Sequence, residues 1–130
     1  MLRTMNETAR SSCPVACTLD IVGDRWTLLV LRDLLIGKQH YEEFLASPEG
    51  IATNVLAERL RRLVALNMVE SQICSDNRRR KKYQLTSLGR SFAPVLAAIA
   101  QWGLAHLAGT QPWPEAQAAL EQELKRQRKR

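Results

Sequence analysis

One amphipathic helix constrains the fold of this chain more than any other feature. Leucines recur at helical spacing over residues 53–66, so this segment is predicted to form a helix with one buried face. Asn54, Glu58 and Arg61 lie on the opposite, polar face. The buried face is expected to consist of residues spaced four, three and four apart, namely Leu56, Leu60, Leu63 and Asn67.

A basic hairpin is predicted directly after this helix. Residues 68–74 favour a strand, Ser75-Asp-Asn is typical of a turn, and residues 82–85 favour the return strand. Adjacent cations occupy the tip and the second arm: Arg78, Arg79, Arg80, Lys81 and Lys82. A helix that can enter a major groove, followed by a hairpin that can lie along phosphates, is typical of a winged helix-turn-helix. The predicted fold class is therefore mainly α with a small β-hairpin wing (α+β), and DNA binding is the leading hypothesis.

Helices are predicted for most of the remaining chain, over residues 14–22, 25–36, 41–46, 87–107 and 115–130. The helix over residues 25–36 is apolar nearly all round, which indicates a position in the middle of the domain, and Asp24 is expected to cap it. Thr86 is expected to cap the long helix over residues 87–107, in which Pro94 would introduce a kink.

Composition limits the classes of protein that this sequence can represent. The chain has 130 residues, 45% of them hydrophobic, which is enough for one domain with a real core. The net charge of +6 favours a polyanionic partner, with nucleic acid ahead of membrane. No signal peptide or membrane span is expected, and the odd number of cysteines suggests free thiols in the cytoplasm.

Three parts of the chain are expected to differ in role. Residues 1–12 are predicted to form a flexible arm, residues 13–108 the winged helix-turn-helix with its dimerisation helices, and residues 109–130 a linker with a basic C-terminal helix. The basic end from Lys125 either adds phosphate contacts or is a solvated terminus. Trp26, Trp102 and Tyr83 are expected in the core or at a dimer interface, not in a ligand site.

Several segments in order resemble HxlR-type transcriptional regulators, bacterial winged-helix proteins related in shape to the MarR group. These segments are Cys13-Pro-Val, Gly23-Asp-Arg-Trp-Thr-Leu-Leu-Val-Leu-Arg-Asp-Leu, Phe44-Leu, Leu56-Ala-Glu-Arg-Leu-Arg-Arg-Leu and Tyr83-Gln-Leu-Thr-Ser-Leu-Gly-Arg-Ser-Phe. The resemblance implies a homodimer that meets through the N-terminal helix and the long helix over residues 87–107. It also implies a regulator, most often a repressor, that binds pseudo-palindromic operator DNA.

The sequence departs from the pattern of this family at three positions. Ala52 stands where the family usually has a small polar cap, so Thr53 is expected to take over the cap of its helix. His40 stands where an arginine or lysine commonly precedes the aromatic residue of the third helix. Lys82 replaces a commonly acidic residue, so the wing is expected to be unusually cationic.

The expected DNA contacts lie on the predicted recognition helix and the wing. Asn54 suits adenine, Glu58 suits cytosine and Arg61 suits guanine as base-edge partners. Arg59, nearer the core, either reaches a phosphate or holds the helix to its neighbours through a charge pair. Outside the five wing cations, the predicted set is Thr53, Asn54, Ala57, Glu58, Arg59, Arg61, Arg62 and His40.

The cysteines suggest a second, redox role. Cys13 at a helix N-terminus would have a lowered pKa and a reactive thiolate, and in some members of the resembling family this cysteine senses oxidants or electrophiles. A Cys13–Cys17 bond within one helix would be strained, because Cβ atoms four residues apart lie about 5–6 Å from each other. A bond from Cys13 to Cys17 or Cys74 of the partner subunit is more plausible. The alternative is a small buried side chain with no switch.

Other functions are weaker alternatives. A low-specificity architectural protein that binds nucleic acid, or a winged helix that binds only proteins, would also fit the pattern. No pair of metal ligands, no cofactor loop and no set of acid, base and nucleophile occurs in the sequence, so neither an enzyme nor a cofactor is expected. The effector, if there is one, is not indicated.

Overall fold

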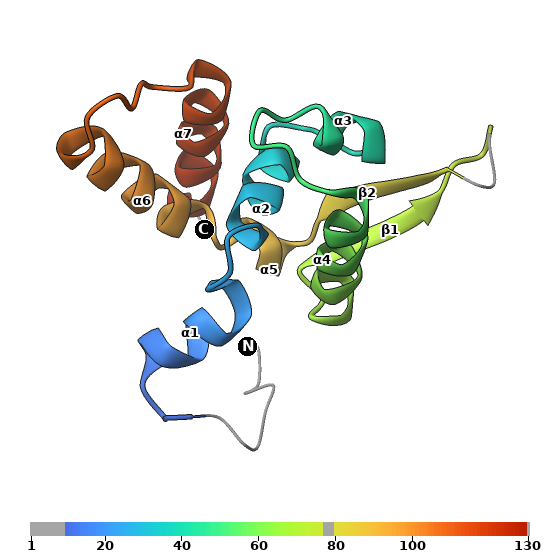
Figure 1. Ribbon diagram of the computed structural model, residues 1–130, viewed down its shortest axis with the longest axis horizontal. Helices are drawn as coiled ribbons and strands as arrows, with labels where there is room; N and C mark the ends of the chain where they lie inside the picture. The colour runs from blue at the N-terminus through green and yellow to red at the C-terminus, as the bar shows by residue number, and fades with distance from the viewer. Residues whose placement is uncertain (1–9, 77–79, 130) are drawn as a thin grey trace.

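A computed structural model describes residues 10–76 and 80–129, and these residues form a helical domain with one β-hairpin (Figure 1). The predicted N-terminal arm over residues 1–12 lies mostly outside the described residues. The elements are α1 (Pro14–Val22), α2 (Thr27–Leu35), α3 (Tyr41–Leu45), α4 (Thr53–Ala65), β1 (Val69–Ile73), β2 (Lys81–Leu85), α5 (Ser87–Arg90), α6 (Ala93–His106) and α7 (Pro114–Arg128).

The core lies where α2, α3 and α4 meet the inner end of the hairpin. Leu31 of α2, Phe44 of α3 and Leu56 of α4 are buried almost completely. The predicted central position of α2 is confirmed, and so is the buried leucine face of α4. Asn67 does not share that face. It lies beyond the end of α4, is exposed, and has a left-handed backbone with φ of 61°.

The start of α2 differs from the prediction by two residues. The helix begins at Thr27 because the Asp24 carboxylate accepts hydrogen bonds from the backbone N–H groups of Trp26 at 3.0 Å and Thr27 at 3.1 Å. Trp26, and not Asp24 as predicted, is the N-cap residue, but Asp24 still satisfies the first free donors of the helix from two residues before it. Gly37, with φ of 101°, ends the helix as predicted.

The predicted continuous helix over residues 87–107 is wrong, because the chain forms two helices there. α5 ends at Arg90, and α6 begins at Ala93 with Pro94 in its first turn. Proline has no N–H, and its ring clashes with the carbonyl group four residues earlier, which here is that of Arg90. A break is thus less costly than a kink. Thr86 caps α5 as predicted, accepting a hydrogen bond from Gly89 N at 3.1 Å.

The predicted wing is present as an antiparallel hairpin in the register Val69↔Leu85 to Ile73↔Lys81. Val69, Tyr83 and Leu85 at its inner end are buried, whereas β1 is exposed from Glu70 onward. The backbone N–H of Tyr83 donates to the carbonyl oxygen of Gln39 at 2.9 Å, which fastens the hairpin to the segment before α3.

The C-terminal helix α7 packs back onto the domain beside α6 and α2 (Figure 1). Ala116 and Glu123 on its inner side are buried. In the linker before it, the Trp113 ring lies 4.3 Å from the Arg32 guanidinium carbon, a cation–π contact with α2. The C-terminal segment is therefore built into the structure of the domain.

Replacing Gly89 with alanine should destabilise the fold, because a Cβ there would lie 2.1 Å from the carbonyl oxygen of Met68. We expect a loss of about 2 kcal/mol in the free energy of unfolding, since backbone on both sides would have to move. Urea denaturation at fixed protein concentration measures it. The matched control is Gly103→Ala in α6, where the nearest atom is 3.9 Å away. Equal stabilities of the two variants would contradict this account.

Candidate nucleic-acid interface

Helix α4 presents an exposed polar face beside the hairpin (Figure 1). Thr53, Asn54 and Arg61 are exposed, and Ala57 and Glu58 are half-buried at its edges. The predicted transfer of the cap to Thr53 is wrong. Ala52 is the N-cap residue without a side-chain hydrogen bond, and Thr53 is the first helical residue.

Two of the arginines predicted to contact DNA hold α4 to its neighbours. Arg59 Nε donates to Asp24 Oδ2 at 2.8 Å, and the Arg59 guanidinium also pairs with Glu58. Arg62 donates to the carbonyl oxygen of Asp20 in α1. The charge-pair alternative for Arg59 is thus present in the structure, and Glu58 has an internal partner. Of the predicted base-reading residues, Asn54 and Arg61 remain the more exposed.

Asp24 joins the start of α2 to the middle of α4. Burial by itself would raise the pKa of Asp24, but hydrogen bonds from Arg59, Thr27 and Trp26 outweigh that effect and hold it well below its usual range. The carboxylate beside it raises the pKa of Arg59 in turn. This contact therefore fixes the orientation of the polar face of α4 relative to the core.

The described wing cations differ in how they are paired. Arg80 forms an ion pair with Glu42 of α3, while Lys81 is exposed and Lys82 is half-buried. A backbone N–H lowers the pKa of Glu42, and Arg80 lowers it further. Arg78 and Arg79 lie outside the described residues. The free positive charge of the described wing is thus on the two lysines.

His40 lies between α3 and the wing. It is the N-cap residue of α3, and its Nδ1 is 3.1 Å from the carbonyl oxygen of Lys81. The Glu43 carboxylate accepts from the His40 backbone N–H at 3.0 Å, completing a capping box. His40 is therefore placed beside the outer end of β2, and one of its ring nitrogens contacts the wing.

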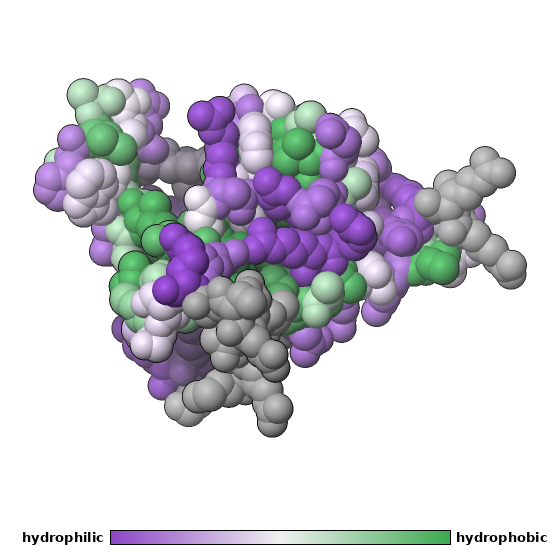
Figure 2. Space-filling view, turned by 60° about the horizontal axis from the view of Figure 1, so that its bottom comes forward, coloured by the Kyte–Doolittle hydropathy of each residue, from purple (hydrophilic) through white to green (hydrophobic). Residues whose placement is uncertain are grey.

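Large apolar side chains are exposed on α1 and α6, away from the hairpin. Val15 of α1 is 67% exposed and Trp102 of α6 is 59% exposed. Figure 2 shows hydrophobic surface on this side of the molecule. The other exposed members are Leu19, Val95, Ile99, Leu104 and Leu107. Apolar area of this kind is costly in water and is typical of a surface that meets another protein.

The three cysteines are free thiols in different surroundings. Cys13 is exposed at the N-cap of α1. Its sulfur makes no full capping hydrogen bond, but the N–H groups of Ala16 and Val15 lower the pKa of its thiol. Cys17 Sγ donates to the carbonyl oxygen of Ser11 at 3.2 Å. Cys74 directly follows β1 in the hairpin.

The described part of the chain carries neither a cluster of metal ligands nor a membrane-spanning helix. No group of histidine, cysteine and acidic side chains there could hold a metal ion. None of the helices described is long and apolar enough to cross a membrane.

The helices and hairpin together define a winged helix-turn-helix protein. The model of the HxlR-like helix-turn-helix family matches residues 21–111. The chain belongs to this family.

Known proteins of similar sequence and structure agree with this assignment. An uncharacterised HTH-type transcriptional regulator of Mycobacterium tuberculosis is 37% identical over 78% of this chain and 61% of its own length. The chain thus spans about three fifths of that relative. Protein PA1607, described as a transcription factor, has a TM-score of 0.72 and 37% identity, covering 83% of this chain and 75% of its own. The oxidised redox regulator HypR has a TM-score of 0.65 and 28% identity, covering 72% and 97%.

Replacing Asp24 with asparagine should lower the free energy of unfolding at neutral pH and make that free energy less dependent on pH in the acidic range. The folded-state pKa of Asp24 lies below the unfolded value, so its contribution is present above about pH 4 and is lost as the pH falls toward the folded pKa. We expect a loss of about 1 kcal/mol at pH 7, shrinking below pH 4. Urea denaturation from pH 7 to pH 3 measures this. An unchanged difference between wild type and variant across that range would rule out the ion pair as the cause.

Proposed function

We propose that this protein is a sequence-specific DNA-binding transcriptional regulator, acting as a homodimer on a pseudo-palindromic operator. The observation that carries the proposal is the exposed polar face of α4 beside a basic hairpin, in a chain of the HxlR-like family. Similar proteins are named transcriptional regulators, which supports a regulatory and not an enzymatic role.

In this proposal, α4 enters the major groove. Asn54 donates to and accepts from an adenine edge, and Arg61 donates to N7 and O6 of a guanine. Lys81 and Lys82, together with Arg78 and Arg79, neutralise flanking phosphates. Arg59 and Arg62 act mainly by holding α4 in place, because both have partners within the chain.

The dimer is proposed to form through α1 and α6. Leu19, Ile99 and Trp102 supply exposed apolar area there, and association would bury it. Two recognition helices about 34 Å apart would then meet successive major grooves on one side of the duplex. Repression follows if the operator overlaps a promoter. The cytoplasm, which keeps thiols reduced, is the setting that fits this proposal.

Replacing Arg61 with alanine should weaken operator binding by about 1–3 kcal/mol and relax specificity at one base pair of each half-site. Fluorescence anisotropy with the DNA upstream of the gene, against scrambled DNA, measures both effects. Lys81→Ala should instead weaken all sequences alike and lower the salt slope by about one.

Arg128→Ala is the matched control for Arg61→Ala, since it removes an exposed arginine from α7. Wild-type binding that is equal for operator and scrambled DNA would favour a low-specificity architectural protein. Absence of binding to either DNA would favour a module that binds only proteins.

A redox response is proposed for Cys13. Its exposure and lowered pKa favour the thiolate, the form that reacts with oxidants, and the similar protein HypR is named a redox regulator. Two thiols would lose two hydrogens to an oxidant such as diamide and form one disulfide. Cys17 of the partner subunit and Cys74 of the partner subunit are the candidate second thiols.

Replacing Cys13 with serine should abolish the effect of diamide on operator affinity and leave the affinity of the reduced protein unchanged, because the serine keeps the size of the side chain. Anisotropy before and after diamide measures this, and a non-reducing gel detects the covalent dimer. Cys17→Ser and Cys74→Ser identify the second thiol. A response to diamide that survives Cys13→Ser at full size would exclude Cys13 as the sensor.

A further inference from the structure

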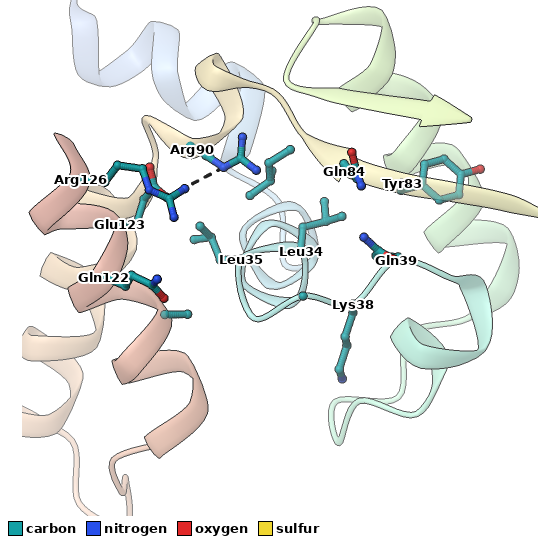
Figure 3. Close-up of a pocket in the computed structure, with 13 residues that line it drawn as sticks. Leu34, Leu35, Lys38, Gln39, Tyr83, Gln84, Arg90, Gln122, Glu123 and Arg126 are labelled. Atoms are coloured by element: carbon teal, nitrogen blue, oxygen red, sulfur yellow. Dashed lines mark hydrogen bonds and ion pairs between the residues drawn. The ribbon is translucent and has the colours of Figure 1, made fainter. Parts of the chain in front are cut away.

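The C-terminal helix forms one wall of a pocket to which helix α4 contributes no residue. The pocket has a volume of about 270 Å³ and lies between α2, β2, α5 and α7 (Figure 3). Leu34, Leu35 and Leu85 supply apolar surface, and Arg90 and Arg126 stand at one end. Most of the exposed surface of the pocket is polar, and the leucines supply the smaller, apolar part of it.

The arginine end of the pocket carries surplus positive charge. Arg90 Nε lies 3.9 Å from Glu123 Oε2, and Arg126 Nη1 lies 3.4 Å from the same oxygen. The Glu123 side chain is only 9% exposed, whereas those of Arg90 and Arg126 are 42% and 51% exposed. One buried carboxylate thus pairs with two guanidiniums at long distances, and both arginine side chains remain open to the solvent. A second anion would complete this arrangement.

The opposite end of the pocket is less suited to an anion. Lys38 Nζ donates to Ser47 Oγ at 2.6 Å and lies 3.9 Å from Asp33 Oδ2, so its charge is already engaged. The uncharged amides of Gln39 and Gln84 lie on the same side as Lys38, and Leu34 and Leu35 lie between that side and the arginines (Figure 3). The charge of a ligand is therefore directed to the end formed by α5 and α7.

We propose that this pocket binds a small organic acid. The carboxylate would meet Arg90 and Arg126, and a short apolar body would lie against Leu34 and Leu35 of α2. The volume of the pocket lies just below the common range for ligand sites, so it suits a molecule of this size better than a nucleotide. Two guanidiniums recognise a planar carboxylate through paired N–H donors, which supplies the specificity.

The position of the pocket connects the ligand to DNA binding. On one side its walls come from α2 and from β2, a strand of the wing that packs on α2. On the other side they come from α5 and from α7, which packs against α6. A ligand that contacts α2 on one side and α7 on the other stabilises the arrangement of these helices in which both contacts are made. This effect on operator affinity rests on the proposed function, whereas binding of the acid does not.

Binding is tested on the free protein by a ¹H–¹⁵N NMR titration with sodium benzoate and sodium hexanoate, with benzamide as the uncharged counterpart. We expect saturable shifts in backbone signals around Leu34, Gln84 and Ala119 with the acids at millimolar concentrations, and at least tenfold weaker binding of benzamide. Equal binding of benzamide and benzoate, shifts confined to other regions, or no saturation with either acid would overturn the proposal.

Substitutions of single arginines distinguish binding by the Arg90–Arg126 pair from binding by the positive charge of the protein in general. Arg126→Gln should weaken benzoate binding at least tenfold, and Arg126→Lys, which keeps the charge but not the paired donors, should weaken it less. Arg128→Gln on the same helix, outside the pocket, is the control and should bind as wild type. Thermal denaturation establishes that each variant is folded. Equal losses in the Arg126 and Arg128 variants would overturn the proposal.

The DNA arm of the experiment adds benzoate to the anisotropy titration. A change in operator affinity that Arg126→Gln removes would support the link between pocket and DNA. Since the NMR titration contains no DNA, failure of the protein to bind any operator would count against the proposed function and leave the binding site standing. Failure of benzoate and hexanoate to bind would count against the site alone.

Discussion

The contact between Asp24 and Arg59 is the interaction on which the proposed DNA-binding surface depends. One carboxylate accepts the first N–H groups of α2 and pairs with a guanidinium in the middle of α4. The buried leucines of α4 determine which face points inward, but apolar packing is tolerant of small rotations. A directional, charge-assisted hydrogen bond between the two helices removes that freedom. Asn54 and Arg61 are therefore held at a defined angle to the wing.

Most of the architecture was predictable because it follows from local chemistry. The spacing of Leu56, Leu60 and Leu63 gives the inner face of α4, and the basic turn gives the hairpin. The errors arose where one local signal competed with another. Pro94 is compatible with the first turn of a new helix and also with a kink inside a longer one. The sequence alone does not show which of the two has the lower free energy. Asn67 continued the leucine spacing, but it tolerates the left-handed conformation that follows a helix end.

Contacts between distant segments were not predictable from the sequence. Arg32 lies in an apolar helix, yet it forms ion pairs with Asp33 and Glu49. Its guanidinium also stacks on the Trp113 ring in a cation–π contact. Each of these partners is unremarkable where it stands in the sequence. The same holds for Arg90 and Arg126, which meet at Glu123 only because α7 folds back against α2 and α6. The recognition face could be found from periodicity, whereas the pocket required the fold.

The arrangement of surfaces restricts how a signal could reach the DNA. Helix α4 and the hairpin lie on one side of α2, and α6 and α7 lie on the other (Figure 1), around a core to which α2 contributes. A close-packed core does not deform gradually, so a signal must change how domains sit on one another or how α7 sits on α2. Cys13 at the start of α1 adjoins the first of these contacts. The pocket beside Leu34 and Leu35 adjoins the second. Oxidation and a small acid would thus act on separate contacts of the same rigid body, and each could alter the spacing of two recognition helices without contacting α4.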